Sequence, residues 1–232
     1  MFAPDQLSTR SRKIAAALIH RGWAWISAVG AVSPDDERGR RYRSMGTASC
    51  IAFPPGAVFG ERWITIGAGT LLGPQVSMSV GMPGEPLDPD ADPVIRIGDR
   101  CNIGRGSSII GRQSIEIGDD VTTGPNVYIT DHNHTYNEID VPITRQWPAE
   151  APVRIGTGSW LGAGVTVLPG TSIGRNVTVG AGSVVRGHVP DHCVIAGSPA
   201  RVVRRFVDGA WDPPIPPQDV RPPAGWNVRD QI

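Results

Sequence analysis

A six-residue period restricts the possible folds of this chain more than any other feature. From residue 155 the sequence reads IGTGSW, LGAGVT, VLPGTS, IGRNVT, VGAGSV, with aliphatic residues at Ile155, Leu161, Val167, Ile173 and Val179. A helix repeats its apolar residues three and four apart, and a strand of a flat sheet repeats them every second residue. The period therefore predicts a solenoid, in which each hexad is a short strand and a turn and stacked coils share a narrow core.

The same unit recurs upstream with interruptions. Its members pair an aliphatic or β-branched residue with glycine or stand in the same register: Ile66-Gly67, Leu72-Gly73, Ile97-Gly98, Ile103-Gly104, Ile109, Ile117-Gly118 and Thr123-Gly124. Two segments break the period, at 79–96 and 130–152, and both are predicted loop insertions. We therefore expect a mainly β chain: an N-terminal helical cap and connector over 1–45, a β-helix over 46–206 and a Pro-rich tail over 207–232.

Composition agrees with this organisation and excludes several classes of protein. The chain holds 29 Gly and 22 Pro among 232 residues, yet 40% of it is hydrophobic, which is too much for a disordered chain. Basic and acidic residues balance at 22 each, so no global field attracts nucleic acid. Cys50, Cys101 and Cys193 lie far apart, as expected of free thiols in a reducing compartment, and we expect a cytoplasmic protein.

The N-terminal segment 8–32 predicts an amphipathic helix. Ile14, Leu18, Trp25 and Val29 recur at helical spacing, and basic residues gather near its start. The favoured interpretation is a cap over the first coil, and the alternative is contact with a membrane surface.

The hexads and the closing GSPARVVR at 197–204 resemble the hexapeptide-repeat acyltransferases, in the branch of the maltose, galactoside and nodulation-factor O-acetyltransferases. The likeness covers roughly 60–205 and is densest from 97 onward. It implies a left-handed parallel β-helix with three hexads to a coil, a homotrimer, and acetyl-CoA as acyl donor without a metal. The expected activity is O-acetylation of a sugar or glycan-like acceptor; the alternative is a non-catalytic trimeric scaffold.

The insertion at 130–152 carries two histidines, His132 and His134. Three interpretations compete: surface polar groups, a zinc-binding pair, or a general base. The zinc reading lacks a third ligand at a suitable spacing. In the resembling family the catalytic histidine lies in this same insertion, which favours a base. The family carries Gly-His or Asn-His just after the repeat stops, and Asp131-His132 is the corresponding pair here, which favours His132 over His134. Asp131, Glu138 or Asp140 could orient the imidazole, and residue pattern does not choose among them.

The resemblance also implies a donor side in the second repeat block. Its members are small, aromatic or basic residues: Trp160, Ala163, Ala181, Arg186, Gly187, Arg201 and Arg204. Small side chains suit a slot for the pantetheine arm, and the arginines suit phosphates. In the alternative, Trp160 is a surface aromatic packed under the loop and the arginines are solvated residues at the end of the β-helix.

The acceptor side departs from the family. Relatives carry Asn and Asp in the coil before the histidine loop, whereas Gly104 and Arg112 stand near those positions here. This difference argues against a simple galactoside or maltose acceptor. Arg145, Gln146 and Trp147 are candidates for contacting another sugar or polyol.

Overall fold

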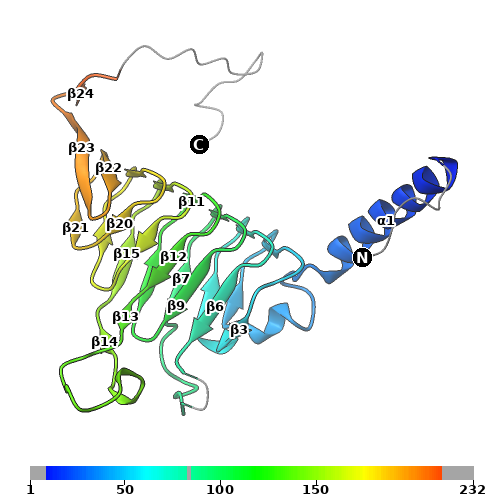
Figure 1. The fold of residues 1–232 in the computed structure, drawn as a ribbon, viewed down its shortest axis with the longest axis horizontal. Coiled ribbons are helices and arrows are strands. Elements are labelled where there is room, and N and C mark those ends of the chain that lie inside the picture. Colours follow the sequence, from blue (N-terminus) through cyan, green and yellow to red (C-terminus); the bar gives the residue numbers. More distant parts are fainter. Residues whose placement is uncertain (1–8, 83–84, 216–232) are drawn as a thin grey trace.

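The chain forms a solenoid whose coils stack along one axis (Figure 1). The computed structural model describes residues 9–82 and 85–215. Within those residues the backbone passes through three parallel sheets in turn, so that one strand in each sheet completes a coil. The predicted mainly β architecture with parallel strands is confirmed.

Each sheet takes its strands from successive coils. The first sheet contains β1 (Ser44–Met45), β4 (Ile64–Ile66), β7 (Ile95–Ile97), β10 (Ile115–Ile117), β15 (Val153–Ile155), β18 (Ser172–Ile173) and β21 (His188–Val189). The second contains β2 (Cys50–Ile51), β5 (Leu71–Leu72), β8 (Asn102–Ile103), β11 (Thr122–Thr123), β16 (Trp160–Leu161), β19 (Thr178–Val179), β22 (Cys193–Gly197), β23 (Ala200–Val207) and β24 (Ala210–Asp212). The third contains β3 (Val58–Phe59), β6 (Ser77–Val80), β9 (Ser108–Gly111), β12 (Tyr128–Thr130), β17 (Thr166–Val167) and β20 (Val184–Val185).

The core is the ladder of residues that the six-residue period identifies. Ile155, Leu161, Val167, Ile173 and Val179 are all buried. The small or β-branched residue four positions after each of them is also buried: Ser159, Val165, Thr171, Val177 and Ser183. Hydroxyls among them bond to backbone, as Ser159 Oγ donates to the Gly174 carbonyl at 3.0 Å. Each coil therefore contributes apolar side chains and self-satisfied small polar ones to a single continuous core.

Two kinds of glycine serve the turns. Gly162 directly follows an aliphatic residue, and a Cβ there would lie 2.6 Å from the backbone nitrogen of Ala181 in the next coil. Gly164 instead has a φ of 67°, in the left-handed region. A glycine after an aliphatic residue, as at Gly162, thus allows coils to stack closely, and a later one with positive φ, as at Gly164, closes the turn.

The side-chain alternation on β5 offers a direct test of this core. Leu72 is fully buried, whereas its neighbour Leu71 on the outer face is 43% exposed. We expect Leu72→Ala to lower the free energy of unfolding by about 2–5 kcal/mol and Leu71→Ala by less than about 1 kcal/mol. Urea denaturation of the two variants measures the difference, and equal losses would contradict the inward and outward assignment.

The two ends of the solenoid differ. At one end α1 (Thr9–Gly30) projects away from the first coil, and the 3-10 turn η2 (Gly39–Arg41) links it to β1 (Figure 1). At the other end β23 turns back antiparallel on β22, and β24 pairs with β23. The segment 200–207 is thus a strand at the end of the solenoid. The predicted tail from 207 is described only to Ile215, and the domain boundaries and the cap remain predictions.

Cys101 and Cys193 are buried and Cys50 is half-buried, and all three are free thiols. No helix in the described part of the chain combines the length and apolar character that crossing a bilayer requires.

Candidate active site

The insertion at 130–152, which carries the two histidines, starts where β12 ends, at the corner between the third and first sheets. Directly after it, β13 (His132–Asn133) pairs antiparallel with β14 (Ala149–Glu150), which closes the base of the insertion. The Ala151 amide donates to the Asp131 carbonyl at 2.8 Å beside this pair. The 3-10 turn η4 (Ile143–Arg145) lies within the loop. His132 is therefore held at the edge of the rigid solenoid.

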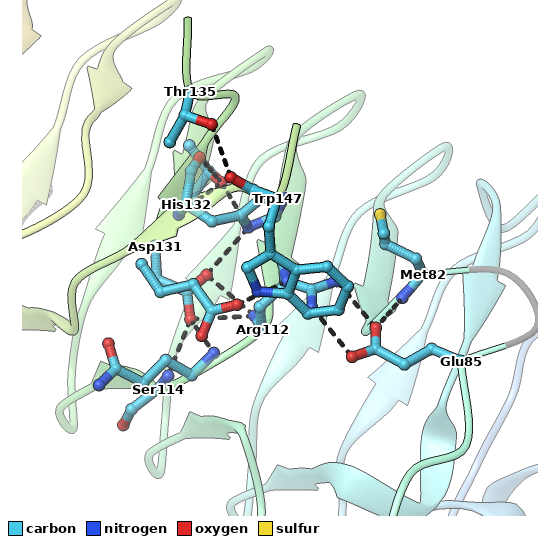
Figure 2. A network of polar contacts seen from close by, with 11 residues as sticks. Met82, Glu85, Arg112, Ser114, Asp131, His132, Thr135 and Trp147 are labelled. Atoms are coloured by element: carbon cyan, nitrogen blue, oxygen red, sulfur yellow. Dashed lines mark hydrogen bonds and ion pairs between the residues drawn. The ribbon is translucent and has the colours of Figure 1, made fainter. Parts of the chain in front are cut away.

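Asp131 is completely buried and its carboxylate is surrounded by donors (Figure 2). The consecutive backbone amides of Arg112, Gln113 and Ser114 donate to it at 2.9, 2.7 and 2.8 Å. Burial opposes its ionisation, but the bond from His132 and the three amides outweigh burial and hold the pKa of Asp131 below its usual value. The backbone amides of the corner after β9 thus favour the ionised form of Asp131.

His132 lies against this carboxylate. Its Nδ1 is 3.0 Å from Asp131 Oδ1 and its side chain is 19% exposed. The Thr130 hydroxyl donates to the His132 carbonyl at 3.1 Å, which fixes the backbone at the same point. With Nδ1–H donated to the carboxylate, the neutral ring carries its lone pair on Nε2. This geometry suits a base that accepts a proton at Nε2 and is stabilised as imidazolium by Asp131.

The other titratable groups of the insertion do not join this pair. His134 is exposed and makes no side-chain hydrogen bond or ion pair with any described residue. Glu138 and Asp140 are also exposed. Of the three carboxylates considered from the sequence, Asp131 is the one in contact with His132.

Arg112 is the buried centre of a second network that sequence reasoning missed (Figure 2). Its side chain is 3% exposed, and the guanidinium makes two bonds to Glu85 at 2.8 and 2.9 Å and one to Glu150 at 2.8 Å. Trp147 stacks over it with 4.8 Å between the guanidinium carbon and the ring centroid. Burial opposes its charge, but the two carboxylates outweigh burial and raise the pKa of Arg112. Arg112 therefore joins both insertions to the coil whose backbone amides hold Asp131.

These contacts revise the candidates for acceptor contact. The Arg112 side chain is engaged within the chain, as is the buried Gln146, whose Nε2 donates to the carbonyls of Glu138 and Val141. Trp147 and Arg145 remain exposed on the insertion. No periodic signal marks Glu85 or Glu150, because each lies in an insertion outside the hexads, Glu85 in a loop and Glu150 in the short strand β14.

The candidates for the donor side occupy a different edge. Ala163 and Ala181 are exposed at the corner between the second and third sheets, one coil apart, and the Gly182 amide donates to the Ala163 carbonyl at 2.8 Å. Trp160 lies half-exposed on the second sheet. Since His132 lies at the other edge of the third sheet, a single chain does not bring these residues to the histidine.

The arginine candidates divide into two groups. Arg204 pairs with Val194, and Val194 with Thr178, which in turn pairs with Trp160. Residues directly opposite one another point to the same face, so Arg204 shares the outer face with Trp160. Arg201 lies on the same strand, opposite Ala196. Arg186 and Gly187 are exposed at the corner between the third and first sheets. His132 lies at this same corner of the solenoid.

Among the described residues, no group of three His, Cys, Asp or Glu side chains could hold a metal ion. The described residues therefore form a solenoid of short repeats with a His–Asp pair at the base of a loop insertion.

Comparison with known proteins identifies the repeat. The family model for the bacterial transferase hexapeptide (six repeats) matches residues 152–187, and that for the hexapeptide repeat of succinyl-transferase matches 94–131. The Escherichia coli protein named "Putative lipopolysaccharide biosynthesis O-acetyl transferase WbbJ" is 39% identical over 127 residues, covering 52% of this chain and 65% of that protein. Galactoside O-acetyltransferase of Escherichia coli is 29% identical over 153 residues, covering 64% of this chain and 66% of that protein.

A solved structure shows the same fold. AntD, an N-acyltransferase from Bacillus cereus in complex with dTDP and 3-hydroxybutyryl-CoA, superposes with a TM-score of 0.62 at 18% identity, over 74% of this chain and 87% of that one. The chain spans 37%, 65% and 57% of the length of three curated relatives that it matches. The chain therefore contains hexapeptide repeats that two transferase family models match, and it is similar to proteins named acetyltransferases.

Proposed function

We propose that this chain is an acetyl-CoA-dependent O-acetyltransferase acting on a hydroxyl of a sugar or glycan-like acceptor. The observation that carries the proposal is the His132–Asp131 pair, in which a buried carboxylate occupies Nδ1 and leaves Nε2 available. The names of two relatives, a galactoside O-acetyltransferase and a lipopolysaccharide O-acetyl transferase, support an acceptor of this class.

In the proposed reaction, Nε2 of His132 takes the proton of the acceptor hydroxyl while the hydroxyl oxygen attacks the carbonyl carbon of the thioester. The C–O bond forms as the carbonyl becomes a tetrahedral oxyanion. Collapse of this intermediate breaks the C–S bond, and the departing thiolate takes the proton from the imidazolium. Asp131 stays ionised throughout and stabilises the imidazolium, because three backbone amides already favour its anionic form.

The donor slot is proposed to run along the corner of Ala163 and Ala181, with Trp160 lining it and Arg201 and Arg204 close to the CoA phosphates. Small side chains at that corner leave its backbone open to a pantetheine arm, and arginine suits phosphate. Arg186-Gly187 lies at the His132 corner and is proposed to reach the phosphates from the neighbouring subunit. Because His132 lies at the opposite edge of the third sheet, the proposed site is completed between neighbouring subunits of a homotrimer of left-handed coils.

The alternative is a scaffold of coils without turnover, and thiol release separates the two. We expect purified protein to release free CoA from acetyl-CoA only when an acceptor is present in a panel of sugars, glycosides and polyols. Ala163→Trp should raise the KM for acetyl-CoA on the order of tenfold or more by filling the donor corner. The matched control is Thr157→Trp, the same hexad position at the preceding corner of the same coil. No turnover with any acceptor, together with no binding of acetyl-CoA, would support the scaffold.

A further inference from the structure

The N-terminal helix α1 exposes an apolar surface that the solenoid leaves uncovered. None of its 22 residues is buried, although the helix is described along its whole length. Leu18, Trp25 and Val29 are 66%, 67% and 65% exposed. Its ring contact with the body is a tilted pair between Trp23 and Phe53, 6.4 Å apart near the C-terminal end. The helix projects from the first coil into open space, so most of this surface is free (Figure 1).

The exposed residues divide the helix into two faces. Ile14, Leu18, Trp25 and Val29 follow one another at intervals of four, seven and four residues and therefore form one stripe. Lys13, His20 and Ser27 recur every seven residues on the opposite side. Ile19 and Ile26 extend the apolar side and are also exposed, whereas Trp23 lies further round the helix, next to Ser27, and meets Phe53. A helix with one broad apolar face and one polar face is built to lie along a boundary between apolar and aqueous phases.

The charge of α1 indicates that the aqueous boundary it meets is anionic. Between Thr9 and Gly30 the sequence has four permanently basic residues, Arg10, Arg12, Lys13 and Arg21, and no acidic residue. The whole chain balances at 22 basic and 22 acidic residues, so the rest of it holds 18 basic and 22 acidic ones. Attraction to an anionic surface therefore comes from the helix and not from the remainder of the chain.

We propose that α1 is a membrane-surface anchor that binds the face of an anionic lipid bilayer. Its apolar stripe inserts at the level of the acyl-chain boundary, its tryptophans lie at the interface, and its basic residues contact lipid phosphates. The solenoid is then held at the membrane by a helix that lies in the plane of the surface. This replaces the cap as the role of the segment, since a cap would bury the face that α1 leaves exposed.

Vesicle flotation of the full chain tests the proposal. We expect binding to phosphatidylcholine vesicles containing about 30 mol% phosphatidylglycerol, little binding to pure phosphatidylcholine, and release as salt rises from about 0.1 to about 0.5 M. Leu18→Ser/Trp25→Ser removes apolar contact and should abolish binding. Arg10→Gln/Lys13→Gln/Arg21→Gln should weaken it about a hundredfold.

A charge-matched control keeps the test specific. Arg96, Arg154 and Arg175 line a shallow groove on the first sheet, away from α1, and their triple Gln variant should bind vesicles like the wild type. Equal loss in the control triple, or no binding of the wild type to anionic vesicles, overturns the proposal. Light scattering gives a second readout. If Leu18→Ser/Trp25→Ser instead lowers the mass of a wild type that ignores vesicles, the helix docks on another copy of this chain.

Discussion

His132→Ala is expected to lower kcat by about 10²–10⁴-fold, the range typical for loss of a general base, while the KM for acetyl-CoA stays close to that of the wild type. The imidazole is positioned by Asp131 at 3.0 Å, and the partly exposed ring leaves Nε2 for an incoming hydroxyl. Removing the ring removes proton abstraction but leaves the coils intact, because His132 lies outside the continuous core.

His134→Ala is the matched control, since this second histidine lies in the same insertion but is exposed. Its kcat should remain within about twofold of the wild type. Both variants are assayed by thiol release under saturating acetyl-CoA, with thermal unfolding to verify the fold. Full activity in His132→Ala with loss in His134→Ala would show that the base is assigned to the wrong histidine.

Asp131→Asn is expected to combine a large loss of activity with a loss of stability. The amide that replaces the carboxylate must turn an NH₂ group toward backbone N–H donors or toward the His132 ring. We expect kcat to fall on the order of 10²–10⁴-fold, because the imidazolium loses its anion and the ring loses its orientation. The free energy of unfolding should fall by about 2–4 kcal/mol, because a fully buried charge with several donors is lost.

The stability loss should depend on pH in a defined direction. The folded protein holds the pKa of Asp131 below its ordinary value of 3.8, so the carboxylate stabilises the fold fully above that pH. Below it the difference between wild type and Asp131→Asn should shrink by about 1.4 kcal/mol per pH unit until the folded-state pKa is reached. Urea denaturation at neutral and acid pH measures this, with the exposed Asp140→Asn as control. A difference that grows on acidification would contradict the assignment.

The coils could be predicted from sequence because their pattern is local and repeated. Each of Ile155, Leu161 and Val167 faces the core, as its place in the hexad requires. The packing role of the glycines could not be predicted in the same way, because the close approach of Gly162 to Ala181 joins residues of different coils. The strand at 200–207 has no hexad to mark it and follows from its pairing with β22.

The candidate site was predictable only where its residues are neighbours in the chain. Asp131 and His132 are adjacent, so the orienting carboxylate was among the candidates. The partners of Arg112 lie 27 residues before it and 38 after it, in loops without a period. Stacking of the coils brings them together, as it brings the amides after β9 to Asp131.

Both insertions leave the solenoid at the same corner and return without disturbing its register. Ile64 still pairs with Ile95 across the first insertion, and Ile115 with Val153 across the second. Changes in loop length are then matters of chain closure, for which each doubling costs only about 0.6 kcal/mol. The length of either insertion can therefore change while the stacked coils stay the same. One constraint remains, because a longer insertion must still place Glu85 or Glu150 in contact with Arg112.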